Sequence, residues 1–167
     1  MKHTKRLAVY GLLVALAFIL SYVESLFPVF FFVPGMKLGL ANLAVFSALY
    51  LLGFRDAFVI SMVRILLVAF TFSNTFSMLY SLAGGILSIA AMEGLKRTGK
   101  FSPVGVSVAG GTAHNIGQIL VAAAVVKTPG VLTYLPVLFV TGCVTGALIG
   151  LLGGSLVKRV QQGLQHF

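Results

Sequence analysis

The stretch LPVLFVTGCVTGALIGLLGG, residues 135–154, contains no charged side chain and decides the class of fold. A helix of this length spans about 30 Å, which matches the hydrocarbon core of a bilayer. The stretch does not alternate between apolar and polar residues, as a transmembrane β-strand would. Because every backbone N–H and C=O in a bilayer needs an internal partner, the stretch predicts a transmembrane helix.

The composition of the whole chain has the same character. Of its 167 residues, 59% are hydrophobic and 9% are charged, and the mean hydropathy is +1.06. A water-soluble domain of this length does not normally have such a composition. We therefore expect an all-α integral membrane protein in which residues 1–167 form a single transmembrane domain.

Apolar runs bounded by charges, Pro or Gly divide the chain into six predicted spans, and together they predict a bundle of six transmembrane helices. The spans cover residues 7–27, 38–53, 56–73, 76–95, 103–126 and 132–157. The second and third are short for a perpendicular crossing, which needs about 20 residues. The basic start at Met1–Arg6 resembles a signal peptide, but no small-x-small cleavage site lies near residues 21–27, so we expect a retained first helix.

The distribution of Lys and Arg predicts the orientation, because positively charged loops tend to stay in the cytoplasm. With the N-terminus inside, the cytoplasmic segments hold Lys2, Lys5, Arg6, Arg55, Lys96, Arg97, Lys100, Lys158 and Arg159, and the external side holds Lys37 and Lys127. This bias predicts a multi-pass protein of the cell (cytoplasmic) membrane with both termini in the cytoplasm. It also explains the formal net charge of +9 by topology, without a nucleic-acid partner.

Small residues at four-residue spacing predict close contacts between helices. The sixth span carries Gly142, Gly146, Gly150 and Gly154, and the fifth carries Gly105, Ala109, Ala113 and Gly117. Packing inside the bundle is the simpler interpretation. The alternative is that one seam faces another subunit or slides during transport.

Arg64 lies near the middle of the third span, where an ionisable side chain costs several kcal/mol unless it is paired, hydrated or facing a cavity. Glu24, the carboxylate in the outer half of the first span, is a candidate partner for a structural ion pair. Binding of a solute by Arg64 is an equally good interpretation, because one guanidinium can serve both purposes.

The fifth span holds Gly111, His114, Asn115 and Gln118 at positions i, i+3, i+4 and i+7, which lie on one face of a helix. An imidazole and two amides on one stripe favour a lined cavity over isolated structural contacts. Lys37 and the start of the second span, with Asn42 one turn deeper, would also attract an anion, although Lys37 could simply reach the membrane interface.

The chemistry of catalysis is missing from the sequence. Its carboxylates are Glu24, Asp56 and Glu93, and no pair is spaced to hold magnesium and a diphosphate. We find no P-loop, HExxH helix or nucleophile elbow, and Cys143 is the sole thiol. We therefore expect no enzyme activity, no metal and no cofactor in this chain, so any ATP hydrolysis would occur in another polypeptide.

Four segments resemble the small bacterial membrane proteins called Gx transporters, a family also labelled heptaprenyl diphosphate synthase component I. They are residues 34–42, the helix of Arg64, residues 81–85 (SLAGG) and residues 110–118 (GGTAHNIGQ). The family in turn resembles the S components of energy-coupling factor transporters. This resemblance implies a six-helix fold with an outward-facing site, a transmembrane coupling subunit and two cytoplasmic ATPases. S components commonly dock through an Ala-xxx-Ala pattern on the first helix, and the matching place here holds Gly11 and Ala15.

The sequence therefore predicts a solute-binding, S-component-like subunit of an ATP-driven uptake transporter for a small vitamin-like or anionic solute. The residues expected to contact the solute are Glu24, Lys37, Asn42, Arg64, His114, Asn115 and Gln118. One alternative is a membrane accessory component of a prenyl diphosphate synthase. Another is a stand-alone carrier driven by an ion gradient, with Glu24 as its proton or sodium site.

Overall fold

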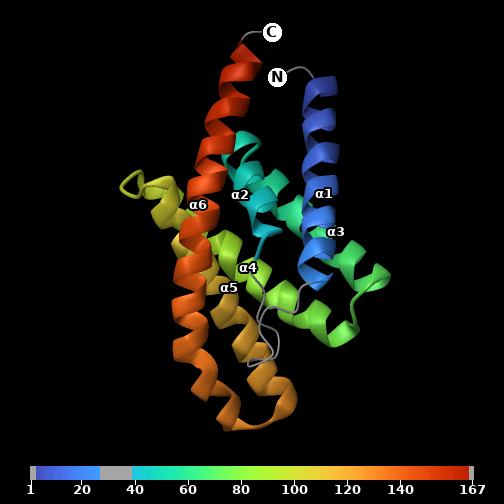
Figure 1. Ribbon diagram of the computed structural model, residues 1–167, viewed down its shortest axis with the longest axis vertical. Coiled ribbons are helices and arrows are strands. Elements are labelled where there is room, and N and C mark those ends of the chain that lie inside the picture. The colour runs from blue at the N-terminus through green and yellow to red at the C-terminus, as the bar shows by residue number, and fades with distance from the viewer. Residues whose placement is uncertain (1–2, 27–38, 166–167) are drawn as a thin grey trace.

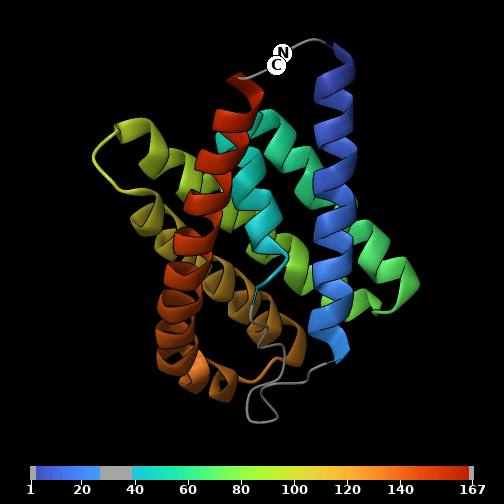
Figure 2. The ribbon, with the colours of Figure 1, turned by 45° about the horizontal axis from the view of Figure 1, so that its top comes forward.

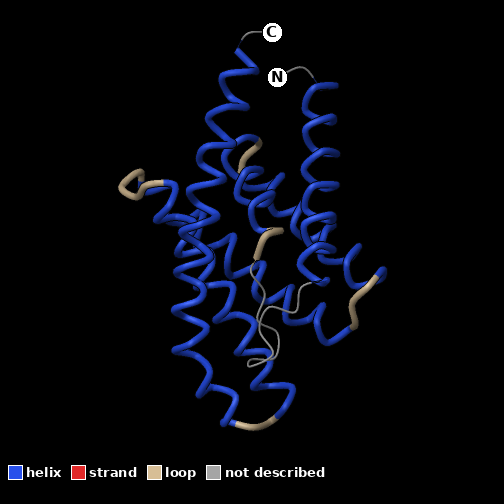
Figure 3. Tube along the Cα trace, in the orientation of Figure 1, coloured by secondary structure: helices blue, strands red, loops and turns tan. Residues whose placement is uncertain are grey.

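The computed structural model describes residues 3–26 and 39–165, and every regular element in these ranges is a helix (Figures 1 and 3). The elements are α1 (His3–Leu26), α2 (Asn42–Leu51), α3 (Phe54–Thr71), α4 (Thr75–Thr98), α5 (Pro103–Val126), the 3-10 helix η1 (Pro129–Tyr134) and α6 (Leu135–Gln165). The prediction of an all-helical fold is confirmed for these residues.

Four helical segments in the described ranges are long and apolar enough to cross a membrane. They are Arg6–Leu26, Thr75–Thr98, Pro103–Val126 and Gly130–Gly163. Helix α2 is apolar but has only 10 residues, and α3 has 18 residues and includes Arg55, Asp56 and Arg64. The length and composition of the four long helices are those of a membrane protein.

Side chains near the helix ends explain why α4 and α5 begin where they do. Asn74 accepts a hydrogen bond from the backbone N–H of Ser77 at 2.8 Å, and Ser102 accepts one from Gly105 at 3.2 Å. Both are N-caps that satisfy a donor without a partner in its own helix. Pro103 follows Ser102 at the first position of α5, where its fixed φ and missing N–H cost nothing.

Helix α2 is shorter than the predicted span 38–53. Gly39 has φ 74° and Gly53 has φ 102°, which are left-handed conformations that interrupt a right-handed helix. At its C-terminal end, the ammonium of Lys96 donates to the backbone oxygen of Leu49 at 2.6 Å and lies 5.0 Å from the ring centre of Tyr50. A long side chain from α4 thus satisfies a carbonyl that the short helix leaves open.

The helices pack in two groups that meet along a limited surface. Helix α5 packs against both α4 and α6, and α1, α2 and α3 contact one another. Contacts of α3 with α4 and of α2 with α6 join the two groups. Helix α2 lies between α1 and α6 and contacts both, and the start of α1 and the end of α6 are at the same end of the molecule (Figures 1 and 2).

Glycines allow α6 to lie directly on the backbone of α5. A Cβ added to Gly142 would lie 3.0 Å from the oxygen of Gly111, and one added to Gly146 would lie 2.7 Å from Cα of Val108. At Gly150 the added atom would lie 2.7 Å from Cα of Val104. These distances confirm the packing interpretation for three of the four glycines in this seam.

On the side away from α6, α5 crosses α4, and the backbones of these two helices are equally close. A Cβ on Gly117 would lie 2.8 Å from the oxygen of Ala83 and 2.9 Å from Cα of Gly84. Real Cβ atoms essentially never approach backbone so closely, so the two helices would have to separate. The glycines therefore allow close backbone contact of α5 with both α4 and α6.

We predict that Gly117→Ala lowers stability by about 1–2 kcal/mol, because overpacking costs more than the roughly 1 kcal/mol that Ala gains in helix propensity. Gly94→Ala is the matched control, since it lies in α4 with nothing within 4 Å of an added Cβ. Thermal unfolding in detergent, followed by circular dichroism, measures both. Equal midpoints for the two variants would contradict the close crossing of α4 and α5.

Candidate functional site

A cavity of about 160 Å³ lies between the two groups of helices. Helices α1, α3, α4 and α5 form its walls, together with the start of α2 and the turn that precedes it. These walls carry charged groups, hydroxyls and apolar side chains. The lining residues are Ser21, Glu24, Ser25, Gly39, Asn42, Arg64, Ile65, Val68, Ala69, Phe72, Ser73, Ser77, Met78, Ser81 and His114. We call this space the main cavity. Four residues predicted to bind a solute, Glu24, Asn42, Arg64 and His114, meet in its walls.

Arg64 is the charged group of the main cavity that most needs a partner. The residue is 8% exposed, and its Nε atom donates to no acceptor within residues 3–26 and 39–165. An unmade hydrogen bond from a buried guanidinium costs about 1–3 kcal/mol or more. A solute with an anionic group at this wall would remove that cost.

Glu24 lies in the same cavity and also fastens two helices together. Its Oε1 atom accepts a hydrogen bond of 2.5 Å from the backbone N–H of Gly39, in the turn that leads into α2. Its charge also interacts electrostatically with Arg64. The carboxylate therefore connects the end of α1 to the turn before α2. Its interaction with Arg64 supports the interpretation of Glu24 as an ion-pair partner. Contact of Glu24 with a solute stays a prediction.

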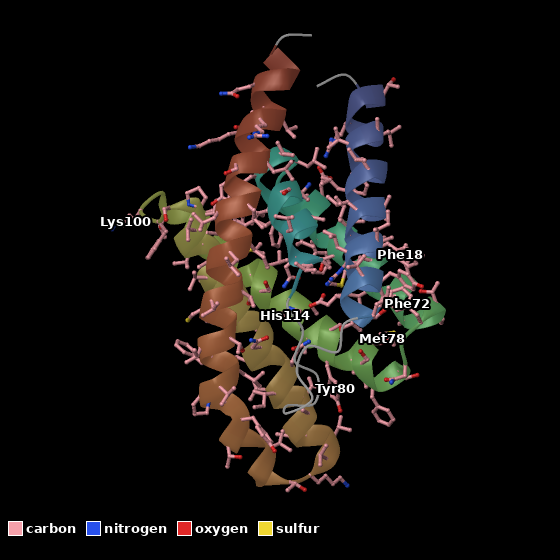
Figure 4. All side chains as sticks on the ribbon, viewed as in Figure 1. Phe18, Phe72, Met78, Tyr80, Lys100 and His114 are labelled. Atoms are coloured by element: carbon pink, nitrogen blue, oxygen red, sulfur yellow. The ribbon has the colours of Figure 1, made fainter. Side chains whose placement is uncertain are left out.

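His114 reaches the main cavity because α4 has a glycine where α5 crosses it. A Cβ on Gly84 would lie 2.8 Å from the backbone oxygen of His114 and 3.0 Å from its ring carbon Cε1. The same atom would lie 3.0 Å from Cγ of Gln118. Figure 4 shows His114 near the middle of the molecule, at the crossing of these helices. Gly84 thus gives His114 and Gln118 room to lie against α4.

The polar stripe of α5 is divided between two neighbouring helices. His114 and Gln118 face α4, whereas Gly111 and Asn115 face α6. The division follows from helix geometry, because adjacent residues point about 100° apart and α5 is packed on both sides. The Nδ2 atom of Asn115 donates to the backbone oxygen of Leu138 at 2.7 Å, so Asn115 has a packing role, and its contact with a solute stays a prediction.

A second cavity of about 20 Å³ lies beside the main cavity, where α2, α4, α5 and α6 meet. It shares Gly39, Asn42 and His114 with the main cavity. Asn115, Ser88, Ser107 and Thr145 add polar groups to its walls. A space of this size holds about one water molecule. Asn42 and His114 therefore form the partition between a solute-sized space and a water-sized one.

Some candidate residues lie apart from these cavities. Lys37 lies outside the described residues, so its predicted role stays a prediction. Gln118 is buried against Gly84 and is not among the described lining residues of either cavity. Gly11 and Ala15 are exposed on the outer face of α1, and nothing lies within 4 Å of a Cβ added to Gly11.

The sequence interpretation missed two sets of lining residues. The first is the serine pair of α1, Ser21 and Ser25, and the second is the apolar set Ile65, Val68 and Ala69 on α3. Both carry helical signals, since the serines lie four apart and flank Glu24, and the α3 set has the spacing i, i+3 and i+4. Small serines and apolar residues are so common in membrane helices that these signals do not single out a site.

The fold and cavities define a helical protein of the membrane type with a polar chamber among its helices. The sequence family described as heptaprenyl diphosphate synthase component I matches residues 13–156. The chain belongs to this family, as its resemblance predicted. Searches of curated proteins and of solved structures each gave no match to the chain.

Replacing Asn115 by Leu tests its packing role. We expect Asn115→Leu to lower stability by about 0.5–1.5 kcal/mol, the usual range for a hydrogen bond between membrane helices. The loss stays moderate because Thr141 also donates to the backbone oxygen of Leu138, at 3.0 Å. Thermal unfolding gives the measurement, with Gln161→Leu on the exposed part of α6 as the control. A midpoint equal to that of the control would contradict the role of Asn115 in joining α5 to α6.

Proposed function

We propose that this protein is a membrane-embedded, S-component-like subunit that binds a small vitamin-like or anionic solute for ATP-driven uptake. The main cavity supports this proposal most directly, because it combines Arg64, His114 and several hydroxyl groups in a space of about 160 Å³ between helices. A buried charge in an apolar helix is costly and usually marks a site of function. Glu24, Asn42 and Lys37 are the further residues that we propose for solute contact.

The proposed topology has six crossings, with both termini in the cytoplasm. The four long apolar helices supply four of the crossings, and α3 together with the shorter α2 supplies the other two. The shared end of α1 and α6 carries Arg6, Lys158 and Arg159, which supports a cytoplasmic location for that end (Figure 1). The main cavity lies near the opposite end of α1, so we propose that it opens outward.

Arg64 supplies the central test of solute binding. We expect purified wild-type protein to carry its solute from the native membrane, with native mass spectrometry detecting the bound mass. Arg64→Gln should weaken binding at least about thirtyfold, or about 2 kcal/mol, because a charged hydrogen bond to the anion is lost. Arg97→Gln is the control, since Arg97 is exposed and pairs with Glu93 at 2.7 Å on the surface.

His114→Ala provides a second measurement at the same site. It removes the imidazole from the wall shared by both cavities and should also weaken binding of the solute. Unchanged affinity in both Arg64→Gln and His114→Ala would contradict the assignment of the main cavity as the binding site.

The outer face of α1 is the proposed docking surface for a transmembrane coupling subunit, which would in turn engage cytoplasmic ATPases. Gly11 and Ala15 provide a smooth, exposed strip beside Leu12, which is 68% exposed. Small residues at this spacing allow close approach of another helix. No contact within the described part of the chain uses the space above Gly11.

We predict that Gly11→Leu abolishes co-purification of the coupling subunit and ATPases while leaving the unfolding temperature unchanged. The side chain would project into open space, so it blocks only an approaching helix. Gly94→Leu places the same bulk on an open position of α4 and should retain the partners. Retention of partners by Gly11→Leu would contradict docking at this face.

A second candidate function is that of a non-catalytic accessory to a prenyl diphosphate synthase, and the description of the family favours it. We propose no catalytic role for this chain, because Asp56 pairs with Arg6 at 2.6 Å and Glu93 pairs with Arg97, away from the main cavity. Addition of the chain to a catalytic synthase subunit should raise product formation if the accessory function is correct. No gain in that assay would reject it.

A further inference from the structure

The main cavity has one continuous apolar wall, which the proposed binding of an anion does not explain. Ile65, Val68 and Ala69 line it from one face of α3, directly after Arg64 in the sequence, and Phe72 lines it just beyond the C-terminal end of that helix. Met78 extends the wall from α4. A fully hydrated anion would leave this wall in contact with water. The wall instead suits an apolar body attached to the charged group.

Phe72 is held in place by two other rings. Its ring centre lies 5.6 Å from that of Phe18 at an interplanar angle of 60°, and 5.4 Å from that of Tyr22 at 72°. Such tilted and edge contacts are the favoured arrangements of aromatic pairs. Figure 4 shows Phe18, Phe72 and Met78 in the same region of the molecule. The solute would therefore meet a positioned ring and an adaptable thioether at this end of the cavity.

The wall from α1 presents acceptors to the solute. Ser21 donates its hydroxyl proton to the oxygen of Ala17 at 2.8 Å, and Ser25 donates to the oxygen of Tyr22 at 2.6 Å. Their oxygen atoms can then only accept further hydrogen bonds. Glu24 adds a carboxylate between these two serines. Because this wall offers acceptors and a carboxylate, it disfavours a second negative charge on the solute, such as a phosphate often carries.

The volume of the cavity limits the solute further. An apolar cavity of about 150 Å³ holds a benzene molecule, and the main cavity is about 160 Å³. One guanidinium is enough to bind one carboxylate through two parallel hydrogen bonds. The single guanidinium, the apolar wall and the volume of the cavity therefore all restrict the solute to a compact molecule with one negative charge.

We infer that the solute is a small monocarboxylate with a compact apolar body, either an aromatic ring or a branched chain. Its carboxylate binds Arg64, and its body lies against Val68, Ala69 and Phe72. This inference rests on the proposed function, because it specifies the solute of the same site. It excludes hydrophilic phosphates and long prenyl diphosphates as occupants of the main cavity.

Four probes that separate charge from apolar body test the inference on the full chain in detergent, by isothermal titration calorimetry. Benzoate has both features, benzamide lacks the charge, acetate lacks the ring, and phenyl phosphate replaces the carboxylate. We expect benzoate to bind at least about tenfold more tightly than each of the other three, which corresponds to about 1.4 kcal/mol. This comparison uses the wild-type protein and does not depend on the folding of a variant.

Two variants of the apolar wall extend the test. Val68→Ser makes the wall polar and Ala69→Leu fills part of the cavity, so each should weaken benzoate binding at least about fivefold and acetate binding by a smaller factor. Val140→Ser, on the exposed face of α6, is the control for a hydroxyl placed outside the cavity. Thermal unfolding of each variant shows that it is folded before titration.

The possible outcomes separate the inference from the proposed function. Acetate or phenyl phosphate binding as tightly as benzoate, with no effect of the wall variants, would overturn the inference and leave anion binding intact. Benzamide binding as tightly as benzoate would remove the role of the charge. Failure of all four probes to bind at millimolar concentration would contradict both the inference and the binding of anions by the main cavity.

Discussion

A guanidinium placed among apolar helices has to be solvated by something, and the position of Arg64 makes that requirement the central constraint on this structure. The residue is 8% exposed, and its Nε atom has no acceptor in the described part of the chain. Charge in a low-dielectric surrounding is expensive to bury, so the helices around Arg64 leave a polar chamber in place of a packed core. Glu24, the serines of α1 and His114 of α5 gather at this chamber. The site thus follows from the cost of burying one charge.

Close backbone packing of α4, α5 and α6 makes this chamber possible. Gly84 and Gly117 at one crossing, and Gly146 at the other, bring backbones together without side chains between them. Three helices held in this way form a firm wall, and the polar residues of α5 can be placed accurately against it. Helices α1, α2 and α3 complete the chamber from the other side. The hydrogen bond from Gly39 to Glu24 fixes α1 relative to the start of α2.

The sequence predicted the helical class and several helix ends well, because those depend on local chemistry. The fifth span was predicted as 103–126, and α5 covers Pro103–Val126, since Ser102 and Pro103 are a readable start signal. The extent of α2 was not predictable, because the left-handed conformation of Gly39 arises from the surrounding structure. Charged and amide residues in apolar helices located the site, whereas the apolar wall around Val68 emerges only once α3 and α4 are placed side by side. Sequence alone also could not show that α5 directs its polar residues to two different helices.

The central claim is that a hydrated chamber surrounds Arg64, and the reactivity of the main cavity toward a water-soluble reagent tests it most directly. Cys143 is the sole thiol of the chain, so its replacement by Ala gives a protein without thiols. A single cysteine can then be introduced at Ser81, which lines the cavity. Leu87, 41% exposed on the outside of α4, gives the matching position that we expect to face lipid. A charged methanethiosulfonate should modify Ser81→Cys rapidly and Leu87→Cys slowly. Equal, slow modification at both positions would show that no hydrated chamber surrounds Arg64, and would contradict the account.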